Sequence, residues 1–204
     1  MNSSPSKAVF LDRDGVINQK AREGDYIRTW GEIQFIPGAV KAVECLNRAG
    51  YKVFVATNQR GVATLKIRMD DLLEIHARIQ QEFARGGAVI SQIYYCPHDV
   101  SVRCRCRKPQ PGMLQRAARE HGLDLRASWM VGDSITDVKA GENAGCRSIL
   151  LASAVPDLSG LSELPFMAES LELTVPLILN GDNLQTRFSR TQHFESRSAS
   201  REDA

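Results

Sequence analysis

The strongest constraint on the fold is a regular alternation of short apolar runs and segments with helical spacing. The apolar runs are rich in β-branched residues and have the length of strands that are buried on both faces. They lie at residues 8–12, 52–57, 91–95, 128–133 and 147–152. The helical segments lie at residues 38–50, 69–87, 111–122 and 136–145. Because right-handed crossovers place helices on both faces of a sheet, this order predicts an α/β, Rossmann-like fold with a doubly wound, mainly parallel sheet.

The domain organisation follows from length and local composition. The chain of 204 residues has the usual size of one compact domain, and no repeat or linker divides it. We expect a flexible N-terminus over residues 1–7 and a single domain over residues 8–180. An amphipathic stretch at residues 168–180 is expected to form a terminal helix, although Pro176 weakens its pattern. Residues 181–204 are polar and rich in Ser and Arg, which predicts a disordered tail.

The charge balance bears on the class of partner. With 26 Lys and Arg against 24 Asp and Glu, the net charge is +2, so no large field of one sign favours nucleic acid or an anionic membrane. No apolar run has the length of a membrane span, and the opening "MNSSPSK" lacks the apolar stretch of a secretory signal. We therefore expect a soluble, cytoplasmic protein. We also expect it to be a monomer with a small-molecule ligand.

Polar residues stand at the ends of three predicted strands. Asp12, Thr57 and Asp133 each close an apolar run. In open parallel sheets, ligands bind outside the carboxyl ends of the strands. The three side chains are therefore expected to meet in one crevice.

The carboxylates at these strand ends suit phosphoryl chemistry. Asp12 can attack phosphorus without a separate base, since a carboxylate is ionised at neutral pH. Asp14 can protonate the leaving alkoxide and later deprotonate a water molecule. Mg²⁺ would reduce the repulsion between Asp12 and a phosphate, and Asp12, Asp133 and the backbone carbonyl of Asp14 would suffice to hold it. Asp137, one helical turn after Asp133, is expected to orient ligands or hold the loop.

Two further motifs supply hydrogen-bond donors and positive charge. "TNQRG" offers the Thr57 hydroxyl with the amides of Asn58 and Gln59, and "CRKPQPG" offers Lys108. Taken singly, each motif is also typical of an ordinary turn, loop or solvated lysine, and a lone "DxD" is most often a turn or helix cap. Their order along the chain and their place at strand ends favour one catalytic site.

Cysteine and histidine gather in one short segment. Cys96, His98, Cys104 and Cys106 offer three thiolates and one imidazole, which is enough for a closed tetrahedral Zn²⁺ site. One residue separates the ligands within each pair, a spacing unlike that of a common zinc finger. The pattern alone leaves free thiols or a redox pair as alternatives.

The motifs "FLDRDG", "VFVATNQRG", "CRKPQPG" and "MVGDSITD", in that order, resemble the haloacid dehalogenase (HAD) superfamily of phosphohydrolases over about residues 8–152. Within it, the sequence is similar to the capless D-glycero-D-manno-heptose 1,7-bisphosphate 7-phosphatases and histidinol-phosphate phosphatases. This resemblance implies a Mg²⁺-dependent phosphatase that forms an aspartyl-phosphate. A heptose bisphosphate, a precursor of the lipopolysaccharide core, is the first substrate it implies. Histidinol phosphate, another small phosphomonoester or a catalytically silent phosphoester-binding relative are the alternatives.

The resemblance also implies the roles of individual residues. They are a nucleophile at Asp12, an acid and base at Asp14, phosphoryl stabilisers at Thr57 and Lys108, Mg²⁺ ligands at Asp12, Asp14 and Asp133, and zinc ligands at Cys96, His98, Cys104 and Cys106. Arg107 is implied to contact the substrate, and Tyr26 is expected to line the pocket.

Two positions depart from the family pattern, and two histidines fall outside it. Residues 99–103, between the ligand pairs of the cysteine segment, form a short stretch, and Ser134 stands where some relatives carry lysine. Both departures concern substrate specificity and leave the catalytic core intact. His76 and His121 are expected to be partly exposed on helices.

Overall fold

The computed structural model describes residues 5–22, 24–152, 157–162 and 164–181. Its centre is a six-stranded sheet in the order β3-β2-β1-β4-β5-β6, with every neighbouring pair parallel. The strands are β1 (Ala8–Leu11), β2 (Lys52–Asn58), β3 (Ile90–Cys96), β4 (Trp129–Gly132), β5 (Arg147–Leu151) and β6 (Phe166–Ala168). The predicted α/β fold with a parallel sheet is thereby confirmed.

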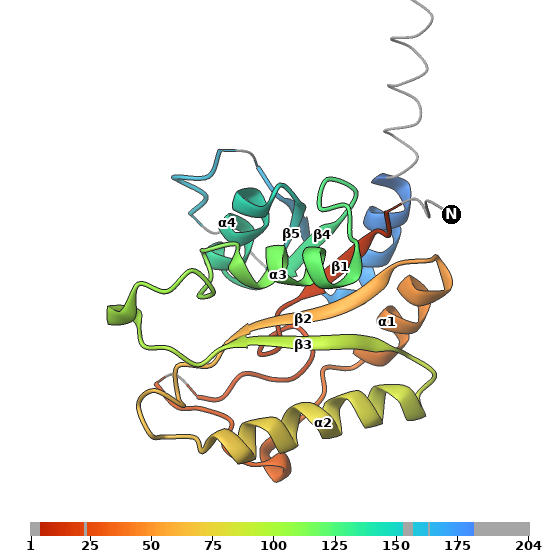
Figure 1. Ribbon diagram of the computed structural model, residues 1–204. Coiled ribbons are helices and arrows are strands. Elements are labelled where there is room, and N and C mark those ends of the chain that lie inside the picture. Colours follow the sequence, from red (N-terminus) through yellow and green to blue (C-terminus); the bar gives the residue numbers. More distant parts are fainter. Residues whose placement is uncertain (1–4, 23, 153–156, 163, 182–204) are drawn as a thin grey trace, which may run out of the picture.

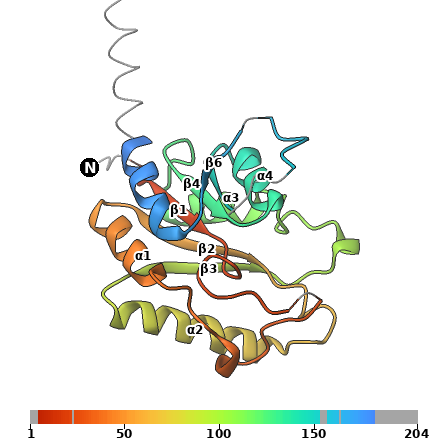
Figure 2. The ribbon, with the colours of Figure 1, turned by 180° about the vertical axis from the view of Figure 1, so that it is seen from behind.

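Helices cover both faces of this sheet (Figures 1 and 2). They are α1 (Ala39–Arg48), α2 (Met69–Arg85), α3 (Gly112–His121), α4 (Ile135–Ala144), the short 3-10 helices η1 (Trp30–Glu32) and η2 (Val100–Val102), and a C-terminal helix over residues 171–181. Side chains of α1, α2 and the C-terminal helix pack in the core of one face. Those of α3 and α4 pack on the other face. The sheet is therefore a middle layer that solvent reaches only at its edges and at the strand ends.

Strand β1 shows how the sequence divides between the two cores. Val9 and Leu11 point to the face of α1 and α2, whereas Ala8 and Phe10 point to the face of α3. Successive side chains of a strand alternate between the two faces of the sheet. A strand that is buried on both faces therefore carries an apolar side chain at every position. The Phe10 ring stacks on Phe54 with centroids 5.6 Å apart. Burying each such ring stabilises the fold by about 1.5–3 kcal/mol.

The C-terminal part of the chain differs from its prediction. Residues 166–168 form the edge strand β6, which pairs with β5, and the helix begins only at residue 171. A three-residue strand is too short to show a hydrophobic period, which explains why the sequence did not reveal it. Apart from residue 181, the predicted tail lies outside the described residues, as do residues 1–4 of the predicted N-terminus. Ser6 forms a bridge with Leu123.

The strand order sets the position of the site. From β1 the chain builds β2 and β3 on one side and then β4, β5 and β6 on the other. Such a reversal opens a crevice at the carboxyl ends of the two strands that flank it, here β1 and β4. The Asp12 N–H donates to Val131 O at 2.9 Å, which holds these two strand ends together.

Within the described residues, no helix has both the length and the apolar character needed to cross a bilayer.

Candidate active site

A cavity of about 320 Å³ lies at the carboxyl ends of β1, β2 and β4. Most of the predicted catalytic and binding residues line it, namely Asp12, Asp14, Tyr26, Thr57, Asn58, Gln59, Lys108, Asp133 and Asp137. They come from segments far apart in the sequence. The sheet therefore brings them together as the strand-end argument predicts.

Lys108 lies between two carboxylates in the lining of this cavity. Its side chain is only 1% exposed, and its Nζ lies 2.9 Å from Asp12 Oδ1 and 2.6 Å from Asp137 Oδ1. Burial alone would lower the pKa of Lys108, but the negative charges of Asp12 and Asp137 raise it above its usual value. The lysine therefore stays charged and compensates both carboxylates.

Three of the acidic side chains that line this cavity form one cluster. Oxygen atoms of Asp12, Asp133 and Asp137 all lie within 4.8 Å of one another. Burial raises the pKa of Asp12 to about 6, although Lys108 opposes the shift, and burial also raises the pKa of Asp133. Since the site penalises their negative charge, it favours an added cation. Grouped carboxylate oxygens fit Mg²⁺, which prefers oxygen ligands.

Two residues near Asp133 were not identified from the sequence. Lys20 Nζ lies 2.6 Å from Asp133 Oδ2, and the Lys20 side chain is 55% exposed. Gly15 adopts φ +89°, and a Cβ there would lie 1.7 Å from Asp133 Oδ2. Only glycine fits both the left-handed turn and this close approach. The sequence signal for Gly15 is its place directly after "DRD".

Asp14 is held by a dense set of donors. Arg13 donates from Nη2 to both Asp14 oxygens at 2.9 Å and from Nε to Oδ1 at 3.1 Å. Asn18 Nδ2 donates to Oδ1 at 2.9 Å, and Gln59 Nε2 donates to Oδ2 at 3.0 Å. Arg13 and Asn18 are buried and were not predicted as site residues. For Arg13 the signal was present, because an arginine between two acids at the end of a buried strand needs a partner.

Asn58 and Gln59 occupy the predicted place but make different contacts. Asn58 Oδ1 accepts from Lys108 N at 3.0 Å, and Asn58 Nδ2 donates to Lys108 O at 3.1 Å. The Gln59 backbone amide donates to Cys96 O at 2.8 Å. The backbone N–H of Gln59 is thus paired with the end of β3, and only the side-chain amide of Gln59 is directed toward the cavity residues Asp14 and Thr57. Gln59 Nε2 instead contacts Asp14 and, at 3.0 Å, Thr57 Oγ1.

Arg107 lies in a neighbouring pocket of about 220 Å³, which Asp99 and Arg103 also line. Its Nη1 is buried and has no hydrogen-bond partner among the described residues. Lys108 lines both this pocket and the catalytic cavity. Arg107 therefore lies on the side of the site that is nearest the cysteine segment, and its contact with the substrate stays a prediction.

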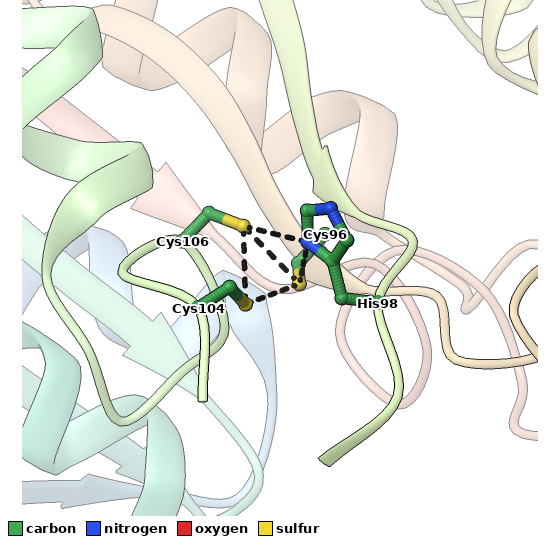
Figure 3. Close-up of side chains that lie close together, drawn as sticks. All are labelled: Cys96, His98, Cys104 and Cys106. Carbon is green, nitrogen blue, oxygen red and sulfur yellow. Dashed lines mark hydrogen bonds between the residues drawn. The ribbon is translucent and has the colours of Figure 1, made fainter. Parts of the chain in front are cut away.

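The predicted cysteine and histidine cluster is present (Figure 3). The Sγ of Cys96 lies 3.5 Å from that of Cys104 and 3.3 Å from that of Cys106, and His98 Nδ1 lies 3.2 Å from the Cys106 Sγ. A zinc tetrahedron with Zn–S bonds of about 2.3 Å has edges of about 3.8 Å, slightly longer than these distances. The four side chains converge from the end of β3 and the following loop, so they fit a closed four-ligand metal site.

His76 is buried, contrary to the prediction that it is partly exposed. It is 5% exposed and lies on the inner face of α2 with Leu72 and Ile79. His76 lies four residues after Leu72 and three residues before Ile79, and this helical spacing was the signal for its burial. His121, by contrast, is partly exposed as predicted.

Comparisons with known proteins agree with this geometry. A family model described as HAD-hydrolase-like matches residues 105–171. A D-glycero-beta-D-manno-heptose-1,7-bisphosphate 7-phosphatase of Pseudomonas aeruginosa is 42% identical over 143 residues, which cover 70% of this chain and 79% of the relative. The D-glycero-D-manno-heptose-1,7-bisphosphate 7-phosphatase of Thermosynechococcus vestitus is 40% identical over 191 residues, with coverages of 85% and 96%.

A solved structure is similar in fold over most of its length. It is the D,D-heptose 1,7-bisphosphate phosphatase from B. bronchiseptica, complexed with magnesium and phosphate. Its TM-score is 0.76 at 34% identity, and the match covers 86% of this chain and 99% of that chain.

Proposed function

Because this chain belongs to the HAD-like hydrolase family, we propose that it is a magnesium-dependent phosphatase that removes the 7-phosphate of D-glycero-D-manno-heptose 1,7-bisphosphate. The observation that carries the proposal is the pairing of Asp12 with the buried Lys108 beside the acidic cluster. The substrate is inferred from the activity for which the relatives are named.

The proposed reaction uses two carboxylates in turn. An oxygen of Asp12 attacks phosphorus, so that an aspartyl-phosphate forms and the ester bond to the sugar breaks. Asp14 gives its proton to the departing sugar oxygen. Asp14 then takes a proton from a water molecule, which attacks the aspartyl-phosphate and releases inorganic phosphate and free Asp12. The proton that Asp14 gave away is thereby restored.

The remaining residues bind and position. Asp12, Asp133 and the backbone carbonyl of Asp14 are the proposed magnesium ligands. When bound, Mg²⁺ supplies positive charge that reduces the repulsion between the nucleophile and the phosphate. Lys108 and Thr57 stabilise charge on the phosphoryl oxygens. Asp137 holds the loop, since it accepts from both the N–H and the hydroxyl of Ser134.

A substrate panel tests this function. Protein purified without chelator in Mg²⁺-free buffer and then given Mg²⁺ is expected to release phosphate from the heptose bisphosphate with a kcat/KM at least about tenfold above that for histidinol phosphate. Activity without added Mg²⁺ is expected to be lost. Preference for histidinol phosphate would contradict the substrate, and absence of any Mg²⁺-dependent turnover would indicate a phosphoester-binding protein.

The cysteine cluster is proposed to hold zinc in a structural role. Since four ligands close the coordination shell, metal analysis of protein purified without chelator is expected to give about one zinc per chain. Cys104→Ser is expected to lose this zinc and to lower the melting temperature. Cys45→Ser is the matched control, because Cys45 lies in α1 outside the cluster. A wild-type protein without zinc would contradict the assignment.

We propose further that the protein is a cytoplasmic monomer with one domain over residues 8–180. Metal-binding thiols stay reduced in the cytoplasm, which supports that compartment.

A further inference from the structure

The guanidinium of Arg13 connects the active site to helix α2. Three of its hydrogen bonds go to the Asp14 carboxylate, from Nε and Nη2. The remaining nitrogen, Nη1, lies 3.3 Å from Nε2 of His76, a residue 63 positions further along the chain. Arg13 is 1% exposed and His76 is 5% exposed, so water does not compete for this contact.

The protonation state of His76 follows from the chemistry of its partner. A guanidinium can only donate hydrogen bonds, so Nε2 of His76 must accept. The imidazole is therefore neutral and carries its proton on Nδ1. The pKa of His76 agrees, because burial and then the Arg13 charge lower it to about 3.

We propose that His76 is a positioning residue of the active site, which fixes the Arg13 guanidinium and through it the orientation of the Asp14 carboxylate. This inference rests on the proposed acid and base role of Asp14. Arg13 has a long side chain that could rotate about several bonds. With an acceptor at Nη1 and the carboxylate at its other edge, the guanidinium plane is held at both ends.

Packing alone does not account for a histidine at this position. The inner face of α2 is otherwise apolar, with Leu72, Ile75, Ile79 and Phe83 fully buried. An apolar side chain would fill the space against the Tyr95 ring, whose centroid lies 5.4 Å from that of His76. It would leave the buried Nη1 donor without a partner. The hydrogen-bond acceptor is thus the property that distinguishes histidine here.

The test uses the leaving group of the substrate. An alkyl phosphate, such as the sugar phosphate, needs a proton from Asp14 as it leaves, whereas p-nitrophenolate leaves without one. The parameter kcat/KM covers the steps up to departure of the leaving group, so it includes the acid step of Asp14 and excludes its later base step. A disturbed Asp14 should therefore lower kcat/KM for the alkyl phosphate far more than for p-nitrophenyl phosphate.

His76→Met and His76→Gln form a matched pair, because the side chains have similar size and only glutamine offers a strong acceptor, its amide oxygen. His76→Met is expected to lower kcat/KM for the alkyl phosphate by about 10–100-fold and for p-nitrophenyl phosphate by less than about threefold. His76→Gln is expected to restore most of the alkyl phosphate activity. His121→Met, at a partly exposed histidine, is the control and should keep the wild-type ratio of the two activities.

Several outcomes would overturn the inference. They are equal losses on both substrates, an unchanged His76→Met, and no recovery with His76→Gln. If His76→Met does not fold, His76→Leu serves the same comparison. Asp14→Asn distinguishes failure of the acid role of Asp14 from failure of the positioning role of His76. If Asp14→Asn lowers both activities equally, the acid role of Asp14 fails; if it discriminates between the substrates and His76→Met does not, only the role of His76 fails.

Discussion

Replacing Asp12 by asparagine is expected to lower kcat by about 10⁴-fold or more, the size of effect seen when an enzyme loses its nucleophile. The amide keeps the shape of the side chain but has no anionic oxygen to attack phosphorus. Release of phosphate from the heptose bisphosphate and from an aryl phosphate measures the loss. Asp70→Asn is the control, because Asp70 is 84% exposed at the start of α2. Activity above about 1% of wild type would exclude Asp12 as the nucleophile.

Asp12→Asn is expected to lose activity but to keep the fold, because the pKa of Asp12 is raised in the folded protein. The pKa of Asp12 is raised from 3.8 to about 6 by burial, with Asp137 and Asp14 adding to the shift, so the folded protein holds this proton more tightly than the unfolded chain. Ionisation of Asp12 therefore destabilises the magnesium-free protein progressively from about pH 4 to pH 6, and fully above that. Lys108 keeps its pairing with Asp137 at 2.6 Å when Asp12 is neutralised, so no buried charge loses its last partner. Asp12→Asn should thus be at least as stable as wild type at pH 8 in Mg²⁺-free buffer, as measured by thermal unfolding.

Replacing Lys108 by methionine is expected to have the largest combined effect on stability and activity. It removes the charge that compensates Asp12 and Asp137, both within 3 Å of Nζ, and leaves two carboxylates of the cavity lining without this partner. Loss of one partner from such a buried pair costs about 3–5 kcal/mol, or about 10 °C in melting temperature for a chain of this size. Loss of a preorganised positive charge should lower kcat/KM by about 10²–10³-fold.

Thermal unfolding measures the effect of Lys108→Met on stability, and phosphate release from the heptose bisphosphate measures its effect on kcat/KM. Thermal unfolding at pH 5 and pH 7.5 is expected to show a smaller destabilisation at the lower pH, where protonation removes unpaired carboxylate charge. Lys41→Met is the matched control, because the Lys41 side chain is 62% exposed and pairs only on the surface with Glu44. Equal melting temperatures for Lys108→Met and Lys41→Met would show that the buried ion pairs do not stabilise the fold.

The positions of Asp12, Thr57 and Asp133 could be predicted because they depend on strand ends. A parallel sheet brings such residues together whatever its loops do. The cysteine cluster could be predicted for another reason, since four ligands within one short segment need little tertiary structure to meet. In both cases the decisive geometry is local or is set by regular structure.

Other contacts depend on side-chain conformations and hydrogen-bond partners that the spacing of residues in the sequence does not predict. Lys20 reaches Asp133 across an irregular loop, and the backbone amide of Gln59 pairs with the end of β3. Neither contact has a period or a motif. The burial of His76 could have been read from its place on the apolar face of α2, but its contact with Arg13 joins elements that are far apart in the sequence.

The two hydrogen bonds between Asn58 and the Lys108 backbone have a consequence for how this enzyme can diverge. Asn58 is the last residue of β2, so the lysine is anchored to the rigid sheet as well as to the segment that precedes it. Residues 99–103 can then lengthen, shorten or change charge with little movement of the ammonium group. New substrate preferences can arise there by insertion and drift, while the machinery for breaking the phosphate ester is inherited unchanged.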